Sequence, residues 1–439
     1  MTNPLLFQSA AELLGQIVAG RSPADAVMER YFRAHSKLGM RERGAVAETV
    51  YACLRRKRSL AFCVTGNHEG IPSAEDLVAA CLITYQGVSA RALAASGYPN
   101  NATTLADQIR RCALESAPSA VQLDLPDWLY TALLDQYGAT ETGALGRALL
   151  EPASLDLRVN TLKAARDEAA TCLATEGYPV ETTPYSPSGL RRPERVPLFK
   201  TRCFRDGLFE VQDEGSQLLS LLLEPRRHEM VVDFCAGAGG KTLHLAALMA
   251  NSGSVYAFDV SAKRLDRLKP RLARAGVDNV RRVVIQNERD VRVQRLAGKI
   301  DRVLVDAPCS GTGTLRRSPD IKWKSPDLDA LTATQRSILA SAASLVKPGG
   351  RLVYATCSLL QCENEAVIRD FLAEHADFSA LSARSILERR GIHLPPDTNE
   401  TVPKFAGNSR DHDFFLRLLP HRHHTDGFFA TVLERQKPD

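Results

Sequence analysis

From about residue 205 onward, the chain alternates short runs rich in Val, Ile and Leu with longer amphipathic segments, and this alternation limits the possible folds most strongly. The spacing predicts a helix over residues 328–346, stopped by the Lys-Pro-Gly-Gly that follows. Strands are expected at residues 230–235, 254–259, 282–286, 302–306 and 351–356. Strands that alternate with helices predict a Rossmann-like α/β domain with a doubly wound parallel sheet.

The C-terminal end of the chain departs from this alternation. Residues 414–419 and 428–433 are typical of two strands joined by a short polar loop, and a short loop forces antiparallel pairing. A parallel sheet closed by an antiparallel hairpin is typical of methyltransferases rather than dehydrogenases. His421, His423 and His424 fall in the loop of this hairpin, where a solvated turn is favoured over a metal site.

The 439 residues are too many for one compact domain, and the pattern divides them into three. Residues 1–150 are predicted to be all-helical, with a capping box at Ser9 and Glu12. Residues 151–204 are predicted to form a small α+β domain of ferredoxin- or RRM-like type, and residues 205–439 form the α/β domain. The basic residues of the small domain that would suit a polyanion are Arg158, Lys163, Arg191 and Arg192.

Composition narrows the class of protein further. Hydrophobic residues make up 44% and charged residues 24% of the chain, which excludes a fibrous or wholly disordered protein. The absence of a long apolar run and of a signal peptide predicts a soluble cytoplasmic protein with no membrane partner. None of the ten cysteines has zinc-knuckle spacing, so we expect free thiols and no metal.

Charge is less informative than its local clustering. A net charge of +5 permits a polyanionic partner without requiring one. The basic tetrad at residues 55–58 is either a nucleic-acid contact or only a solvated helix end, where cations also suit the helix dipole.

A glycine-rich loop follows the first predicted strand of the α/β domain and opens a helix. Residues 233–242 read Asp-Phe-Cys-Ala-Gly-Ala-Gly-Gly-Lys-Thr. Glycines let a ligand approach the backbone closely, and the start of a helix offers free N–H groups. The nucleotide phosphate-loop pattern fails because Cys235 stands at its first glycine, and the dinucleotide pattern fails because Thr242 stands at its last.

Polar side chains stand at the ends of the strands that follow this loop. Asp259 ends the second strand, where a carboxylate can hold the ribose hydroxyls of an adenosyl cofactor. Asn287 follows the third strand, with Asp290 as the alternative, and Asp306 ends the fourth. Open α/β sheets bind ligands at the carboxyl ends of their strands. S-adenosylmethionine is therefore the best candidate for the cofactor.

Two cysteines come directly after neighbouring strands, Cys309 in Asp-Ala-Pro-Cys-Ser-Gly-Thr-Gly and Cys357 in Tyr-Ala-Thr-Cys-Ser. Carbon 5 of a cytosine is too electron-poor to accept a methyl group unaided, and a thiolate that adds to carbon 6 makes carbon 5 nucleophilic. The methyl group then transfers from a sulfonium to carbon 5, a base removes the proton on carbon 5, and the thiol leaves. An ordinary thiol is largely protonated at pH 7, so Lys241 is a candidate for lowering its pKa. Asp306 can hydrogen-bond the ring nitrogen of the base.

Rival chemistries fit the same residues less well. Amine methyltransferases commonly carry Asn/Asp-Pro-Pro-aromatic where this chain has Asp-Ala-Pro-Cys at residues 306–309. A zinc deaminase needs His-x-Glu and Pro-Cys-x-x-Cys, and Thr312 occupies the place of the second cysteine.

At these residues the chain closely resembles the RNA cytosine-5 methyltransferase family, of the RsmB/Nop2 type whose bacterial members methylate small-subunit ribosomal RNA. Residues 233–242, 306–313 and 355–358 are similar to its three main motifs, residues 211–217 to its leading helix, and residues 407–413 to its approach to the final hairpin. The helical first domain resembles the NusB-type domain of the bacterial members. The family's loop usually carries Ala-Pro-Gly-Gly, and the missing proline is expected to loosen the loop slightly.

The resemblance implies a role for each residue. Cys357 is expected to attack carbon 6 and Cys309 to assist breakdown of the covalent adduct, a division that spacing alone does not settle. Asp306 and Lys241 complete the catalytic set. Arg316 and Lys322, in a basic run beside an aromatic, are expected to contact RNA. The residues expected to contact S-adenosylmethionine are Cys235, Ala236, Gly237, Ala238, Gly239, Gly240, Lys241, Asp259, Asn287 and Asp306.

The sequence thus predicts a monomeric, S-adenosylmethionine-dependent enzyme that methylates carbon 5 of a cytosine in RNA, and small-subunit (16S) ribosomal RNA is the favoured substrate. Two alternatives stay open. One is a tRNA cytosine-5 methyltransferase, and the other is a non-catalytic RNA-binding factor in ribosome assembly. The second has no use for two intact cysteines.

Overall fold

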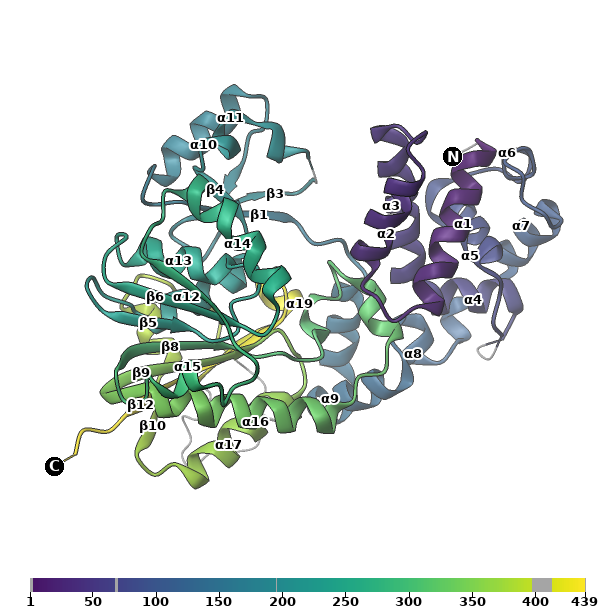
Figure 1. Ribbon diagram of the computed structural model, residues 1–439. Helices are drawn as coiled ribbons and strands as arrows, with labels where there is room; N and C mark the ends of the chain where they lie inside the picture. Colours follow the sequence, from purple (N-terminus) through teal and green to yellow (C-terminus); the bar gives the residue numbers. More distant parts are fainter. Residues whose placement is uncertain (1–2, 68–69, 195, 397–412, 439) are drawn as a thin grey trace. The chain divides into compact units, whose positions relative to one another are not determined.

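The computed structural model describes residues 3–67, 70–194, 196–396 and 413–438 (Figure 1). The chain forms two compact units. The helical unit consists of Met1–Pro152 together with Thr314–Ser325, and the sheet unit consists of Ala153–Gly313 together with Pro326–Asp439. The motif expected at residues 407–413 lies almost wholly outside the described residues.

The helical unit is built around a core of buried apolar side chains that includes Phe7, Leu14, Val50 and Leu77. The first helix begins earlier than expected, because Pro4 occupies its first turn and the Asn3 side chain accepts the N–H of Leu5 at 2.9 Å. The predicted capping box is therefore wrong. The α-helices are α1 (Pro4–Ala19), α2 (Ala24–Ala34), α3 (Met40–Arg55), α4 (Lys57–Thr65), α5 (Ala74–Gln86), α6 (Ala90–Ala95), α7 (Ala102–Arg111), α8 (Ser119–Gln122) and α9 (Asp127–Leu149).

Ser9 and Glu12, the two residues of that predicted capping box, lie inside α1. Ser9 is buried, and the Glu12 carboxylate accepts the hydroxyl of Tyr31 from α2 at 2.8 Å. These residues therefore join two helices rather than starting one.

A segment from the second half of the chain, Thr314–Ser325, is part of the helical unit and not of the sheet domain expected over residues 205–439. It carries a short 3₁₀ helix, Pro319–Trp323. The indole N–H of Trp323 donates to the carbonyl of Leu54 in α3 at 2.7 Å. Asp320 accepts the backbone N–H of Ala24 at the start of α2, at 3.1 Å. These contacts join residues that are far apart in sequence, so no local pattern could have revealed them.

The basic tetrad at residues 55–58 is engaged within the helical unit. Arg55 is buried. Arg58 donates to the carbonyl of Leu125 at 2.6 Å and pairs with Asp127 at 2.7 Å. The ammonium of Lys57 lies 4.8 Å from the centroid of the Trp323 ring. These contacts favour a structural role for the tetrad over the nucleic-acid contact that the sequence left open.

The sheet unit contains an eight-stranded sheet with the order β10-β12-β9-β8-β5-β6-β7, and β11 pairs with β12. Strands β5 to β9 pair in parallel, whereas β10, β11 and β12 are antiparallel to their partners. The predicted Rossmann-like sheet closed by an antiparallel hairpin is confirmed. The strands are β5 (Met230–Asp233), β6 (Ser254–Asp259), β7 (Val280–Val284), β8 (Ile300–Asp306), β9 (Val346–Thr356), β10 (Phe378–Leu381), β11 (Phe415–Leu418) and β12 (Phe428–Arg435).

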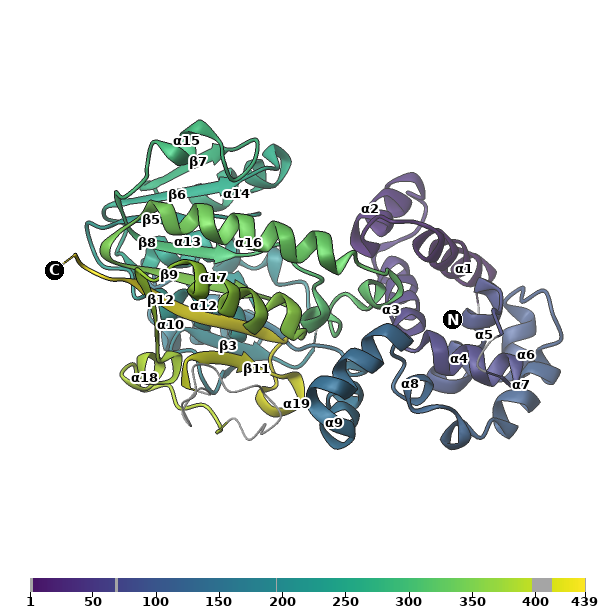
Figure 2. The same cartoon turned by 90° about the horizontal axis from the view of Figure 1, so that it is seen from below.

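Helices cover both faces of this sheet. Val231 and Val232 are adjacent in β5 and therefore point to opposite faces, into two separate cores. One core contains α12 (Glu214–Leu223), α13 (Gly240–Leu248), α14 (Ala262–Ala275) and α18 (Ala383–Glu388). The other contains α15 (Val291–Gln294), α16 (Leu328–Leu345) and α17 (Glu365–Glu374), of which α16 and α17 lie across the strands in Figure 2.

A second, four-stranded antiparallel sheet has the order β2-β3-β1-β4 and carries two helices. Its fourth strand lies beyond residue 204, so the small domain extends further than the boundary expected there. The small sheet also belongs to the same compact unit as the large one. Its elements are β1 (Leu155–Val159), α10 (Arg166–Thr175), β2 (Glu181–Thr182), β3 (Gly189–Arg192), α11 (Arg202–Arg205) and β4 (Phe209–Val211).

Most basic residues of the small sheet are held by the protein itself. Arg191 pairs with Asp156 at 2.7 Å, and Arg192 donates to the carbonyl of Pro179. Lys163 donates to the carbonyls of Asp206 and Arg274, each at 2.7 Å. A polyanion would have to compete with these contacts, so the expected role of these side chains in binding one is not favoured.

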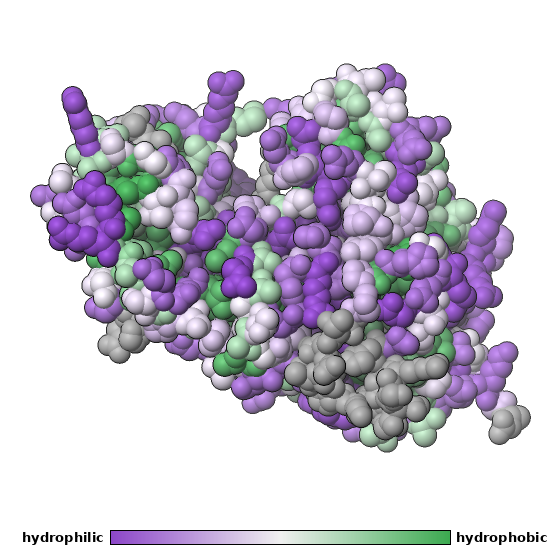
Figure 3. Space-filling view, turned by 180° about the vertical axis from the view of Figure 1, so that it is seen from behind, coloured by the Kyte–Doolittle hydropathy of each residue, from purple (hydrophilic) through white to green (hydrophobic). Residues whose placement is uncertain are grey.

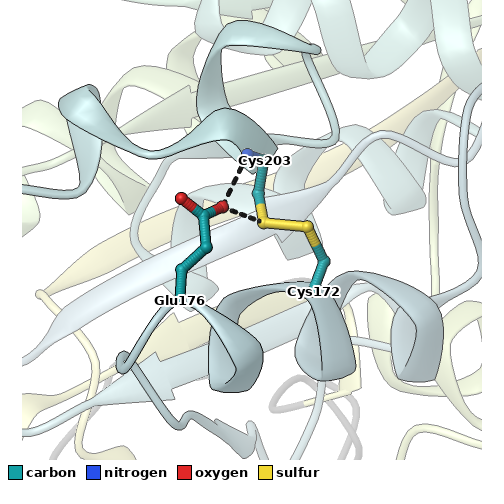
Figure 4. Close-up of side chains that lie close together, drawn as sticks. All are labelled: Cys172, Glu176 and Cys203. Carbon is teal, nitrogen blue, oxygen red and sulfur yellow. Dashed lines mark hydrogen bonds between the residues drawn. A yellow bond between two sulfur atoms is a disulfide. The ribbon is translucent and has the colours of Figure 1, made fainter.

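Four of the ten cysteines form disulfides, contrary to the prediction of free thiols. Cys63 is bonded to Cys112 in the helical unit, and Cys172 is bonded to Cys203 beside the small sheet. Figure 4 shows Glu176 next to the second pair, where its carboxylate accepts the backbone N–H of Cys203 at 3.0 Å. The ligand atoms of Cys172, Glu176 and Cys203 are close enough to hold a metal ion, but two sulfurs bonded to each other cannot both serve as thiolate ligands.

Hydrophilic side chains cover most of the face seen in Figure 3, and hydrophobic residues show there in separate patches. The large apolar side chains that are exposed, such as Met40, Phe199 and Val260, come from different elements. Within the described part of the chain, no helix is both long and apolar enough to span a membrane.

Lys322 offers a test of how Thr314–Ser325 is fixed in the helical unit. We expect Lys322→Ala to lower the free energy of unfolding of this unit by about 3 kcal/mol, because it removes a buried cation near the buried carboxylate of Asp124. Trp128 and Trp323 are the chain's two tryptophans and both lie in this unit, so fluorescence during urea unfolding measures it selectively. Lys324→Ala, which removes a partly exposed ion pair, should cost about 1 kcal/mol or less. Equal losses in the two variants would contradict this account.

Candidate active site

The residues predicted to form the site lie together at the carboxyl ends of β5, β6, β8 and β9. They line a cavity of about 560 Å³, within the usual range for a small-molecule site. Gly239 is the one predicted cofactor residue that does not line it. The predicted residues in the lining are Cys235, Ala236, Gly237, Ala238, Gly240, Lys241, Asp259, Asn287, Asp306, Cys309 and Cys357.

The cavity also includes residues that the sequence did not single out. Glu288 directly follows Asn287, and the strand-end argument could have found it. Thr334 and Ile338 come from α16, which carries no local signal of a site. Asp290, the alternative to Asn287, does not line the cavity. Its carboxylate accepts the N–H of Gln286 at 2.8 Å and pairs with Arg292 instead.

The glycine loop depends on glycine at two positions. Gly237 and Gly239 both have positive φ, +57° and +83°, which side chains other than glycine rarely adopt. A Cβ on Gly239 would also lie 2.2 Å from Leu268 Cδ1. The N–H of Gly237 donates to Asp259 Oδ2 at 2.8 Å, so the carboxylate at the end of β6 fixes the loop as well as facing the cavity.

Two arginines hold the carbonyls of this loop, which lacks the expected proline. Arg271 of α14 donates to the carbonyl of Ala238 at 2.6 Å, and Arg158 of β1 donates to that of Gly240 at 2.7 Å. Glu210 in β4 pairs with Arg271 at 3.0 Å. The small sheet thus supports the loop. Arg158 is buried, and burial lowers its pKa to about 9. It therefore has no surface to offer a polyanion.

Charged groups are concentrated behind the loop. Lys241 Nζ donates to Asp306 Oδ2 at 2.8 Å. Burial favours the neutral amine, but Asp306 and Asp233 outweigh it and raise the pKa of Lys241. The side chain is therefore a cation at neutral pH. Burial raises the pKa of Asp233 to about 7, although Thr242 donates a hydrogen bond to it at 2.6 Å.

The two predicted thiols are in contact, with 3.4 Å between Cys309 Sγ and Cys357 Sγ. Hydrogen bonding to Cys357 and burial raise the pKa of Cys309, which therefore stays a protonated donor. Cys357 also contributes to the raised pKa of Lys241. Cys235 is a poor nucleophile by comparison, because burial raises its pKa.

The two residues predicted to bind RNA lie in the helical unit. Lys322 is 1% exposed and donates to the carbonyl of Arg55 at 2.7 Å, and burial lowers its pKa to about 8. It has almost no surface to offer RNA, so the structure does not support that expectation. Arg316 is partly exposed and donates to the carbonyl of Pro152 at 3.2 Å.

The fold and the site together define a class of protein. An antiparallel β12 between β9 and β10, a glycine loop after the central strand and a cavity at the carboxyl edge are the features of a Rossmann-like methyltransferase. Two family models match the chain. The 16S rRNA methyltransferase RsmB/F model matches residues 220–434, and the model of its ferredoxin-like domain matches residues 125–198.

Individual relatives agree with these matches. The chain is 38% identical to the probable ribosomal RNA small subunit methyltransferase B of Bacillus subtilis, over 75% of this chain and 69% of that protein. It is 32% identical to the 28S rRNA (cytosine(4447)-C(5))-methyltransferase of Homo sapiens, over 72% of this chain and 38% of that longer protein. The crystal structure of PH0851 has a TM-score of 0.75 and 28% identity, over 98% of this chain and 99% of that one. The chain therefore belongs to the RsmB/F family of RNA cytosine-5 methyltransferases, as the sequence predicted.

The hydrogen bond from Arg271 to the glycine loop can be tested separately from the ion pair of Arg271 with Glu210. We expect Arg271→Ala to weaken binding of S-adenosylmethionine about tenfold, because the loop loses the donor to Ala238. Arg274 is a matched control, since it also pairs with Glu210 but makes no hydrogen bond to the loop. Isothermal titration calorimetry should therefore give an unchanged Kd for Arg274→Ala. An equal loss of affinity in both variants would show that the ion pairs with Glu210, and not the hydrogen bond to the loop, cause the effect.

The raised pKa of Asp233 predicts a pH dependence of stability. The folded chain keeps a proton on Asp233 that the unfolded chain releases, so this contribution is full at about pH 4 and is lost as the pH rises through about 7. Asp233→Asn should therefore unfold at a higher temperature than the parent at pH 8 and at nearly the same temperature at pH 4. Differential scanning calorimetry at the two pH values measures this, and a constant difference would refute it.

Proposed function

We propose that this protein transfers a methyl group from S-adenosylmethionine to carbon 5 of a cytosine in small-subunit ribosomal RNA. The observation that carries the proposal is the contact between the Cys309 and Cys357 sulfurs, 3.4 Å apart at the edge of the cavity that the glycine loop lines. A methyltransferase that acts on nitrogen or oxygen needs neither thiol. Two thiols in contact suit a cytosine that one thiol must attack and that the other must help to release.

The cavity fits the proposed cofactor. The glycine loop offers a close approach of the backbone and the first N–H groups of α13, and Asp259 and Asn287 supply polar groups at the ends of β6 and β7. Asp233 Oδ1 is buried and has no hydrogen-bond partner among the described residues. When bound, S-adenosylmethionine would supply an electrophilic methyl group on a sulfonium.

The residues of the chain divide the remaining work. Cys357 Sγ, which is in contact with the sulfur of Cys309, adds as a thiolate to carbon 6 of the cytosine and makes carbon 5 nucleophilic. Asp306, itself held by Lys241 at 2.8 Å, hydrogen-bonds the ring nitrogen during this attack. After methylation, a base takes the proton from carbon 5 and the bond from Cys357 to carbon 6 breaks. Cys309, in contact with the departing sulfur, assists that step.

The substrate is proposed from the relatives. The family model is named for 16S rRNA, and the relative from Bacillus subtilis is named for the small ribosomal subunit. A tRNA remains the alternative substrate of the same chemistry. We expect the protein to act as a monomer in the cytoplasm, as its sequence suggested.

The two cysteines should fail in different ways. Cys357→Ala is expected to abolish methyl transfer to 16S rRNA, because it removes the sulfur that attacks carbon 6 and contacts Cys309. Cys309→Ala should instead accumulate a protein–RNA adduct that survives denaturing electrophoresis. Tritium transfer from labelled S-adenosylmethionine to 16S rRNA, with tRNA as a parallel substrate, measures both.

Cys362→Ala is the matched control for this experiment. Cys362 is an exposed free cysteine close in sequence to Cys357, and its replacement should leave transfer unchanged. Normal methylation by Cys357→Ala would overturn the assignment of the nucleophile. Transfer to tRNA but not to 16S rRNA would overturn the assignment of the substrate.

A further inference from the structure

A buried carboxylate lies directly behind the two thiols. Glu363 follows β9 in a short 3₁₀ helix, Gln361–Glu363, and its side chain is fully buried. No cation pairs with it among the described residues. Such a carboxylate is costly to bury unless hydrogen bonds satisfy its oxygens. The hydrogen-bond partners of Glu363 therefore show which segments its carboxylate fixes.

The partners of Glu363 are the residues that directly follow the two thiols. Its Oε1 accepts the backbone N–H of Ser310 at 2.8 Å, and its Oε2 accepts the Ser310 hydroxyl at 2.5 Å. Oε2 also accepts the hydroxyl of Ser358. One carboxylate thus binds the residue after Cys309 and the residue after Cys357.

Residues of α16 and β9 also hydrogen-bond Glu363. Gln335 of α16 donates from Nε2 to Glu363 Oε1 and to the carbonyl of Pro308, each at 3.0 Å. The hydroxyl of Tyr354 in β9 donates to the Glu363 carbonyl at 2.7 Å. Gln335 and Tyr354 are themselves fully buried. A buried network with this many bonds is rigid, so the loops after β8 and β9 cannot separate without breaking it.

We propose that Glu363 is a positioning residue for both thiols, holding the segments after Cys309 and Cys357 on one anchor so that the two sulfurs stay in contact. The proposal rests on the function proposed above, since it gives a reason for the contact between the sulfurs. Glu363 does not line the cofactor cavity, and it acts on the reaction only through the two loops. Its charge also opposes ionisation of Cys309, which keeps that thiol a donor to Cys357.

The geometry can be tested without RNA or cofactor. Phenylarsine oxide condenses with two neighbouring thiols, forming two arsenic–sulfur bonds and releasing one water with no change of oxidation state. The arsenical is titrated against the full chain and against its Cys309→Ala variant. The binding that is lost in this variant reports the contact between the two sulfurs. We expect Glu363→Ala to weaken this part at least about tenfold, because displacements near 1 Å already disrupt a reacting geometry.

Two further variants separate positioning from stability. Glu363→Gln keeps a group that can bond Ser310, Ser358 and Gln335, so it should bind the arsenical within about threefold of the parent. Glu365→Ala removes a neighbouring, largely buried carboxylate that pairs with Arg417 at 2.6 Å. It should lose stability but bind the arsenical as the parent does.

The same variants should divide the kinetic constants of methyl transfer. Glu363→Ala is expected to lower kcat at least about tenfold and to leave the KM for RNA and the Kd for S-adenosylmethionine within about threefold. If Glu363→Ala does not fold, the double variant Ser310→Ala with Ser358→Ala replaces it. The double variant removes both hydroxyl partners and is expected to weaken the arsenical in the same way.

The outcomes are distinct. Arsenical binding by Glu363→Ala, or by the double variant in its place, equal to that of the parent would overturn the positioning role, whatever happens to methylation. A parent protein that binds the arsenical through Cys309 and Cys357 but methylates no RNA would overturn the proposed function and leave the positioning role in place. A Kd for S-adenosylmethionine that changes as much as kcat would show a general loss of structure instead, and would also refute the proposal.

Discussion

The parallel pairing of β8 with β9 is the constraint on which the site depends. The register places Asp306 beside Ala355, and the N–H of Ala307 donates to the Ala355 carbonyl at 2.8 Å, one residue beyond the end of β8. Because both strands run in the same direction, the chain leaves the sheet on the same side after each of them. Cys309 and Cys357 are 48 residues apart in sequence, and this register is what brings their sulfurs into contact. A shift of one residue in one strand would turn its side chains to the opposite face.

The second requirement is a fixed loop on the neighbouring strand. Lys241 reaches Asp306 from the start of α13, so the helix that follows the glycine loop is joined to the strand that precedes Cys309. Arg158 and Arg271 hold the loop from the other side, through its carbonyls. The structure thus replaces the rigidity of a proline by hydrogen bonds from two other elements. The site is fixed by contacts from both sheets of the sheet unit.

What the sequence could predict was local or periodic. The strands at Ser254–Asp259 and Ile300–Asp306 followed from apolar runs, and the residues at their ends followed from the rule that ligands bind at the carboxyl edge. The antiparallel end of the sheet followed from two strands with a short connection. These features depend on neighbours in the chain, and so they could be inferred from a single sequence.

What it could not predict depends on contacts across long separations. Lys322 stands in a basic run typical of an RNA contact, yet it is buried against Arg55, which is 267 residues away. The disulfide partners Cys172 and Cys203 gave no signal in their spacing. Ser9 and Glu12 matched a capping pattern, but Asn3 and Pro4 start the helix first. Glu363 carries no motif of its own, and only the packing of α16 and β9 around it reveals what it binds.

The place of Thr314–Ser325 in the helical unit limits how the chain can be divided into separate fragments. The polypeptide enters the helical unit twice, once at the start and once directly after the loop of Cys309. In the second segment, Trp323 packs against the core of that unit. A cut near residue 152 would therefore not yield two independent modules. The N-terminal piece would lack the segment that packs against its core, and the C-terminal piece would carry that segment, with Trp323, without the helices it packs against.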